Sequence, residues 1–202
     1  MLDVHVIDDP AAAAVALEPV RSRLLAELSE PASAAALAAR VGIPRQKVNY
    51  HLRALEAHGL VRVADTRRWG GLTERRMVAS GGSYVVSPGA LGPAAADPRR
   101  REDPLSAGYL LALAGRIVRE VGALVRGARI ANQPLGTLAL DTEIRFRSPA
   151  DAAAFAHELG RAVASLTARY HDAEAPGGRP HRLVVAAHPI PLETPAEEPS
   201  CP

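Results

Sequence analysis

Residues 42–63 have the sequence Gly-Ile-Pro-Arg-Gln-Lys-Val-Asn-Tyr-His-Leu-Arg-Ala-Leu-Glu-Ala-His-Gly-Leu-Val-Arg-Val. A proline favours the first turn of a helix because the N–H that it lacks would be unpaired there, and Gly59 tolerates the left-handed conformation that ends many helices. Val48, Leu52 and Leu55 recur at spacings of four and three, which predicts one buried stripe. The pattern predicts a short amphipathic helix from Pro44 to His58.

The other side of this predicted helix carries polar side chains that suit nucleic acid. Gln46, Asn49, Tyr50 and Arg53 recur on that face. They offer donors, acceptors, a ring and a guanidinium, which fit base edges and phosphates in a DNA major groove. An ordinary solvated helix face has the same periodicity, so the flanking segments must distinguish the two interpretations.

Those segments predict a helix-turn-helix followed by a hairpin. Ser33–Val41 is a short alanine-rich helix, and the turn Gly42–Pro44 separates it from the next. Leu60–Asp65 alternates like a strand, Thr66–Gly71 forms a loop with two glycines, and Leu72–Ala79 is a second strand. Such a hairpin is called a wing.

Four runs carry a family resemblance. They are Leu17-Glu18-Pro19-Val20-Arg21 leading into Leu24-Leu25-Ala26-Glu27-Leu28, Ala36-Leu37-Ala38, Val48-Asn49-Tyr50-His51-Leu52-Arg53-Ala54-Leu55, and His58-Gly59-Leu60-Val61. In this combination, over about residues 12–86, the chain resembles winged helix-turn-helix regulators of the ArsR type. The resemblance implies a dimeric transcription factor whose helix Pro44–His58 enters the major groove of double-stranded DNA, while the wing grips the flanking backbone or minor groove.

Charge is distributed accordingly. Residues 44–79 contain eight basic and three acidic side chains, a local excess of five, against a net charge of +2 for the whole chain. Basic residues displace counterions from phosphates, although such an excess can also arise by chance. The predicted base readers are Gln46, Asn49, Tyr50 and Arg53. The predicted backbone contacts are Arg45, Lys47, Arg67, Arg68, Arg75 and Arg76. His51 is predicted to pack or to contact phosphate rather than to catalyse.

Length, composition and the predicted elements indicate an α+β protein whose 202 residues form two domains. We expect a winged helix-turn-helix domain at 1–86 and a linker rich in proline and arginine at 87–104. A small effector or dimerisation domain should follow at 105–190, and a disordered tail at 191–202.

The second domain is predicted to have the order helix, strand, helix, strand. Pro104–Ile130 forms a long helix, with an apolar seam for its own domain or for a partner helix: Leu110, Leu113, Ile117, Val121 and Leu124. Gly136–Arg147 alternates like a half-buried strand. Ser148 begins a helix that runs to about His171, and His181–His188 is the last strand. The helix is predicted to bury five side chains: Phe155, Leu159, Val163, Leu166 and Tyr170. Two strands alone are marginal, so the sheet needs support from the helices or from a partner subunit.

Histidine spacing argues against a metal site in this domain. His157 and His171 would lie about 21 Å apart on one helix, and His181 and His188 would face opposite sides of a strand. A small organic effector could instead occupy an apolar cleft near four aromatic residues: Tyr109, Phe146, Phe155 and Tyr170. Each could equally fill a core, and the domain could serve dimerisation alone. Trp69 at the wing tip could meet a partner subunit, the second domain, DNA or a ligand.

Several classes of protein are excluded. The single cysteine, Cys201, rules out a disulfide framework, and no apolar run or leader points to a membrane or to export. No nucleophile elbow, phosphate-binding loop or paired carboxylates indicate an enzyme or a cofactor. The sequence therefore predicts a cytoplasmic, homodimeric DNA-binding regulator that acts as a repressor. The alternative is a winged-helix module that binds proteins or ligands and does not use DNA.

Overall fold

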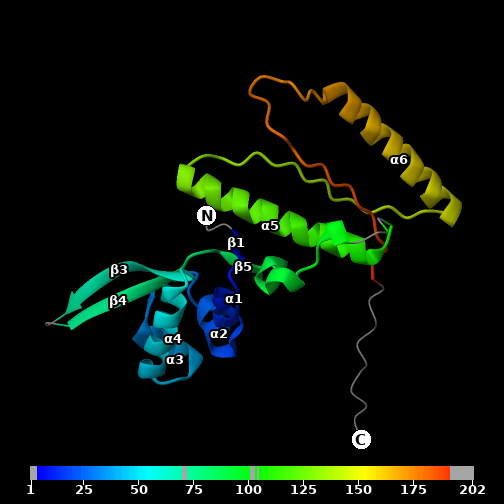
Figure 1. The fold of residues 1–202 in the computed structure, drawn as a ribbon. Coiled ribbons are helices and arrows are strands. Elements are labelled where there is room, and N and C mark those ends of the chain that lie inside the picture. Colours follow the sequence, from blue (N-terminus) through cyan, green and yellow to red (C-terminus); the bar gives the residue numbers. More distant parts are fainter. Residues whose placement is uncertain (1–3, 70–71, 101–102, 104, 192–202) are drawn as a thin grey trace, which may run out of the picture. The chain divides into compact units, whose positions relative to one another are not determined.

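The structure is a computed structural model that describes residues 4–69, 72–100, 103 and 105–191. It divides the chain into two compact units, 1–136 and 137–202, which we describe separately (Figure 1). Helices and short strands are mixed in the first unit, so the predicted α+β class is confirmed.

Four short helices follow the first strand of the first unit: α1 (Pro10–Leu17), α2 (Pro19–Ala26), α3 (Ala34–Val41) and α4 (Arg45–Ala57). Side-chain caps mark the starts of α1, α2 and α3. Asp9 accepts a hydrogen bond from the Ala12 N–H at 2.8 Å, and Ser33 accepts one from the Ala36 N–H at 3.3 Å. Helices α3 and α4 are joined by the predicted turn, so the helix-turn-helix has the expected order.

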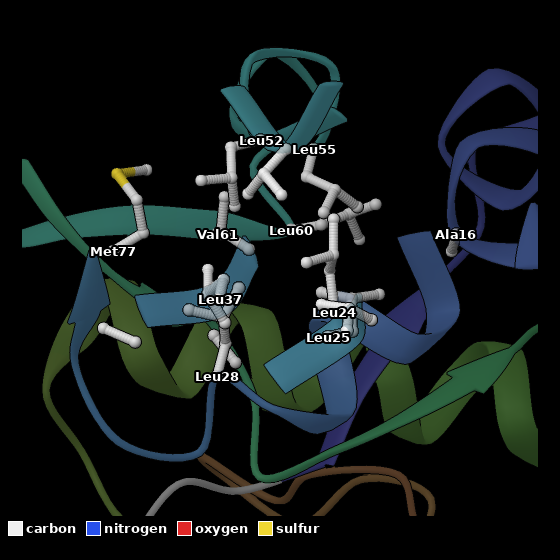
Figure 2. Packing of buried hydrophobic residues seen from close by; sticks show 14 of the residues in the cluster. Ala16, Leu24, Leu25, Leu28, Leu37, Leu52, Leu55, Leu60, Val61 and Met77 are labelled. Atoms are coloured by element: carbon white, nitrogen blue, oxygen red, sulfur yellow. The ribbon is translucent and has the colours of Figure 1, made fainter. Parts of the chain in front are cut away.

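Leucines from these helices and from the start of the wing converge on one core. The side chains of Leu24, Leu28, Leu37, Leu55 and Leu60 are fully buried. Figure 2 shows these five leucines in one cluster that also includes Val61 and Met77. Burial of several leucines supplies most of the favourable free energy available to a domain of this size.

The wing belongs to a three-stranded antiparallel sheet in the order β2–β4–β3. Its strands are β2 (Ala32–Ser33), β3 (Val61–Trp69) and β4 (Leu72–Ala79). The prediction that residues 66–71 form a loop was wrong for 66–69, which pair with 72–75. A register shift between Val63 and Asp65 breaks the alternation there. At this bulge the side chains switch from one face of the sheet to the other. The alternation of apolar and polar residues therefore stops at the bulge, whereas the strand continues to Trp69.

The start of the described chain forms a strand. β1 (Val4–Ile7) pairs in parallel with β5 (Ser83–Val86). Tyr84 of β5 donates its hydroxyl hydrogen to the Leu60 carbonyl at 2.6 Å, which ties this sheet to the start of the wing. Burial raises the pKa of Tyr84, although N–H donors from Gly81 and Ser80 act in the opposite direction.

The segment predicted as a linker at 87–104 contains two 3₁₀ helices, η1 (Pro88–Ala94) and η2 (Pro98–Arg100). Helix α5 (Ala107–Ala131) then belongs to the first unit, so the unit boundary lies after Gly136 rather than in that segment. Small residues allow α5 to approach its neighbours. A Cβ at Gly122 would lie 2.8 Å from Val6 Cγ1, and one at Gly115 would lie 3.3 Å from Pro88 Cγ.

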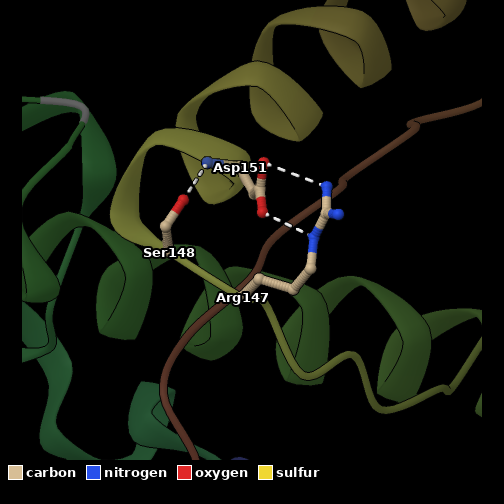
Figure 3. A network of polar contacts seen from close by, with 3 residues as sticks. All are labelled: Arg147, Ser148 and Asp151. Carbon is tan, nitrogen blue, oxygen red and sulfur yellow. Dashed lines mark hydrogen bonds and ion pairs between the residues drawn. The ribbon is translucent and has the colours of Figure 1, made fainter.

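The second unit contains one regular element among its described residues, helix α6 (Pro149–Tyr170). It begins as predicted: Ser148 accepts a hydrogen bond from the Asp151 N–H at 3.1 Å, and the Arg147 Nε lies 3.0 Å from Asp151 Oδ2 (Figure 3). The strands predicted at 136–147 and 181–188 are absent from the described structure. Alternation favours a strand, but a strand forms only where its backbone finds a partner.

Gly42 provides a test of the turn between α3 and α4. Its φ is +71° and no atom lies within 4 Å of the place that a Cβ would occupy, so Gly42→Ala tests backbone strain alone. We expect a loss of about 1 kcal/mol in unfolding free energy, measured by urea denaturation. Gly127→Ala in the interior of α5 is the control. Its Cβ would also meet nothing within 4 Å, and we expect it to be neutral or stabilising; equal effects of the two substitutions would contradict this assignment.

Candidate nucleic-acid interface

Helix α4 presents the predicted base readers on one open face. Its apolar side chains Val48, Leu52 and Leu55 are buried, whereas its polar face is exposed, with Tyr50 65% exposed. One shallow depression is lined by five of the predicted residues: Arg45, Gln46, Asn49, Tyr50 and Arg53. The structure therefore brings all four base readers and one predicted backbone contact together.

Two histidines on the opposite side of α4 lie beside carboxylates at the starts of the preceding helices. His51 Nδ1 lies 3.7 Å from Glu18 Oε2, and His58 Nδ1 lies 3.8 Å from Asp9 Oδ2. Both carboxylates also cap helices: Glu18 caps the start of α2, and Asp9 caps the start of α1. The spacing of seven residues puts both histidines on the same face, and this spacing was the available sequence signal. His51 is largely buried, which fits the predicted packing role.

Glu18 is held in its charged form at this junction. Desolvation acts to raise the pKa of Glu18, but hydrogen bonds from the Arg21 and Val20 N–H groups, with the charges of His51 and Arg21, lower it below its usual value. A charged carboxylate accepts the N–H groups at the start of α2 more strongly than a neutral one. The cap and the contact with α4 thus reinforce each other.

The wing adds exposed positive charge beside α4. Arg67 and Arg68 are exposed on β3, opposite Glu74 and Thr73 of β4. Among the described residues, neither arginine has an ion pair within 4 Å, and the same holds for Arg45, Lys47 and Arg53. The side chain of Trp69 lies outside the described part of the structure, as do Gly70 and Gly71.

Arg75 and Arg76 have intramolecular partners that the sequence did not indicate. Arg75 Nη2 lies 2.5 Å from Glu56 Oε1, which joins the wing to the end of α4. Arg76 Nη1 lies 2.9 Å from Asp65 Oδ2, and its Nη2 donates to the Pro31 carbonyl at 2.6 Å. These two residues position the wing. The other four predicted backbone contacts have no ion pair among the described residues: Arg45, Lys47, Arg67 and Arg68.

The predicted aromatic cleft does not form as a single site within the second unit. Phe146 and Phe155 are neighbours, with ring centroids 5.4 Å apart. Tyr170 is 77% exposed, and it lies 15 residues after Phe155 on α6, about 22 Å along the helix. The expectation that Leu166 and Tyr170 are buried was wrong, because α6 has no covering element on that part of its surface in the described structure; Leu166 is 52% exposed. Tyr109 belongs to α5 in the first unit.

Metal ligands and membrane-spanning helices were the other features to consider. No group of three or more His, Cys, Asp or Glu side chains in the described ranges has the arrangement of a metal site. Among the described helices, none combines the length and the apolar character that crossing a bilayer requires.

A family of known proteins has the same local pattern. Residues 16–64 match the family model of a helix-turn-helix domain. This match spans α2, α3, α4 and the start of the wing. The chain is also similar to a solved structure, that of NolR from Sinorhizobium fredii. The identity is 27%, the match covers 36% of this chain and 68% of the NolR chain, and the TM-score is 0.30. No curated protein matches the sequence.

Proposed function

We propose that the protein is a sequence-specific, DNA-binding transcriptional regulator that acts as a homodimeric repressor in the cytoplasm. The observation that carries the proposal is the open polar face of α4, where Gln46, Asn49 and Arg53 surround one depression while the opposite face is buried. The side chains on this face can pair with base edges, and exposed arginines on the wing can neutralise phosphates on either side.

The anchoring of α4 supports this function. Specific recognition needs side chains held in a fixed register, since a base contact misplaced by an ångström is lost. The buried side chains Val48, Leu52 and Leu55 seat α4 on the core, and the ion pair of Glu56 with Arg75 joins its C-terminal end to the wing. A helix fixed in this way presents its polar face without a further ordering cost.

Helix α5 supports the proposed homodimer. Its small residues pack within the chain, whereas Ile117, Val121 and Leu124 on another face are exposed. An apolar seam at spacings of three and four suits pairing with a second helix of the same kind. Two copies would present two α4 helices to successive major grooves of a symmetric operator.

We propose that a small organic effector modulates the complex. The adjoining rings of Phe146 and Phe155 are the apolar contact that the second unit offers to such a molecule. Release of the protein from DNA by cell extract, and not by dialysed extract, would support an effector. If the protein stays bound to DNA in both extracts, the proposal of an effector is contradicted.

An electrophoretic shift with the DNA upstream of the protein's own coding region tests the function directly. Selection from a random duplex library extends the test to any operator. Binding of a defined sequence above random DNA supports the proposal. Equal binding of all sequences, or none, would favour the alternative module that does not use DNA.

Asn49→Ala tests the role of α4 in this assay. The substitution removes an exposed amide that can pair with one base, so we expect a loss of discrimination of about 1–3 kcal/mol at one base pair and unchanged preferences elsewhere. The preferences are measured by binding to single-substituted operators. Gln133→Ala, which removes an exposed amide after α5, should leave every preference unchanged. An identical profile for Asn49→Ala and the unmodified chain would contradict the assignment.

A further inference from the structure

Among the described residues of the second unit, the two most exposed apolar side chains lie in the 137–147 segment: Leu138 is 84% exposed and Leu140 89%. Ile144 of the same segment is 50% exposed. The segment has no regular secondary structure (Figure 1). In the described structure none of its residues belongs to a strand or shares a backbone hydrogen bond with another segment. An alternating apolar segment with free backbone groups is a template for pairing with another strand.

The charges of this segment are symmetric about Ile144. Glu143 precedes Ile144 by one position and Arg145 follows it by one; Asp141 precedes it by three and Arg147 follows it by three. An antiparallel pair of two copies centred on Ile144 would set Glu143 opposite Arg145 and Asp141 opposite Arg147, in both directions. Parallel pairing in register would instead place like charges together.

The same centre also keeps the two faces of the pair distinct. Opposing residues lie at equal distances on either side of Ile144. The even-numbered apolar positions of one copy therefore face even-numbered positions of the other, and the odd-numbered charged positions face odd-numbered positions. Thr142 would lie opposite Phe146, and Ile144 opposite its own copy. This is the arrangement that a two-fold axis requires, because each contact then occurs twice.

From this self-complementary pattern we infer that the 137–147 segment is an interface with a second copy of this chain, paired as antiparallel strands across a two-fold axis at Ile144. The inference rests on the proposed homodimer and assigns it a second contact besides α5. The other irregular segment, 181–190, is a poorer partner for this edge. It carries His181, Arg182 and His188 but no acidic residue to face Arg145 and Arg147.

The described contacts of the segment are compatible with this pairing. Arg147 bonds Asp151 through Nε and Nη2, at 3.0 and 3.5 Å, yet its side chain is 90% exposed (Figure 3). A guanidinium has five N–H donors, so it can serve Asp151 and a carboxylate of the partner together. Among the described residues, Asp141, Glu143 and Arg145 have no ion pair.

Cysteine cross-linking tests the geometry. In full-length protein carrying Cys201→Ser, Ile144→Cys places two thiols at the axis, where facing Cβ atoms lie about 5 Å apart, and mild oxidation should give a covalent dimer. Leu138→Cys is the control, since six residues of strand place each copy about 20 Å from the axis. Cross-linking at 144 and not at 138 supports the inference. No cross-link at 144, or equal cross-linking at both positions, overturns it.

Charge reversal provides an independent readout. Glu143→Arg sets like charges opposite each other at two symmetric places, and we expect a dimer that dissociates about tenfold more readily in sedimentation equilibrium. Glu143→Arg combined with Arg145→Glu regenerates both pairs and should restore the dimer. Glu158→Arg on the exposed surface of α6 should have no effect. A double variant as weak as the single one overturns the inference.

Binding to the selected operator is measured on the same samples, so the two proposals can fail separately. Sequence-specific binding without cross-linking at 144 overturns the strand pairing and leaves the regulator in place. Cross-linking at 144 without any sequence-specific binding supports the pairing and overturns the regulator.

Discussion

Leu55→Ala is expected to lower the unfolding free energy by about 3 kcal/mol, because it opens a cavity in the centre of the core. Leu55 is fully buried and lies where α4 packs on Leu24, Leu37 and Leu60 (Figure 2). The change also removes one of the three buried side chains that seat α4 on the core, which are Val48, Leu52 and Leu55. Operator binding should therefore weaken at temperatures where the variant is still folded.

Urea denaturation followed by circular dichroism measures this effect. The midpoint should fall, while the dependence on urea concentration stays unchanged. Leu17→Ala removes the same atoms from a side chain that is 67% exposed at the end of α1, and should cost less than about 1 kcal/mol. Equal losses for Leu55→Ala and Leu17→Ala would mean that α4 is not seated on this core.

The second large effect concerns the wing. Arg67→Ala combined with Arg68→Ala should weaken binding to every DNA sequence alike and make the salt dependence shallower by about two units on a double-logarithmic plot, since each phosphate contact releases about 0.9 of a counterion. Both side chains are exposed and have no ion pair in the described structure. Sequence preference should survive, because the α4 side chains are unchanged.

Fluorescence anisotropy titrations between about 50 and 200 mM salt give this slope. The control is Arg161→Ala combined with Arg169→Ala, which removes the same charge from exposed positions on α6. If the control flattens the slope as much as the wing variant, net charge rather than wing contact explains the effect.

Local chemistry allowed most of the helix-turn-helix domain to be predicted. Ser33 marks a helix start in that domain, and Ser148 marks one in the second unit, because a short polar side chain before an apolar stripe satisfies free N–H groups. Gly42 and Gly59 mark left-handed turns, with φ of +71° and +67°. The open face of α4 follows from its period, since one buried stripe defines the opposite side.

Contacts between distant residues could not be predicted in this way. The parallel pairing of β1 with β5 joins segments about 80 residues apart, and nothing in either segment specifies the other. The bridge from Arg75 to Glu56 depends on how the wing folds over α4, so a count of charges could not indicate it. The expected strand at 136–147 has the right alternation, but alternation does not supply a partner.

The position of β1 has a practical consequence for anyone who shortens the gene. Val4–Ile7 covers the edge of Ser83–Val86, and Val6 fills the space that Gly122 leaves on α5. A truncated chain starting at Pro10 would leave an uncovered strand edge and a hollow on the long helix in the same place. Uncovered strand edges pair with strands of other molecules. A poor yield of the truncated chain would therefore reflect aggregation through this edge rather than a defect in the helix-turn-helix.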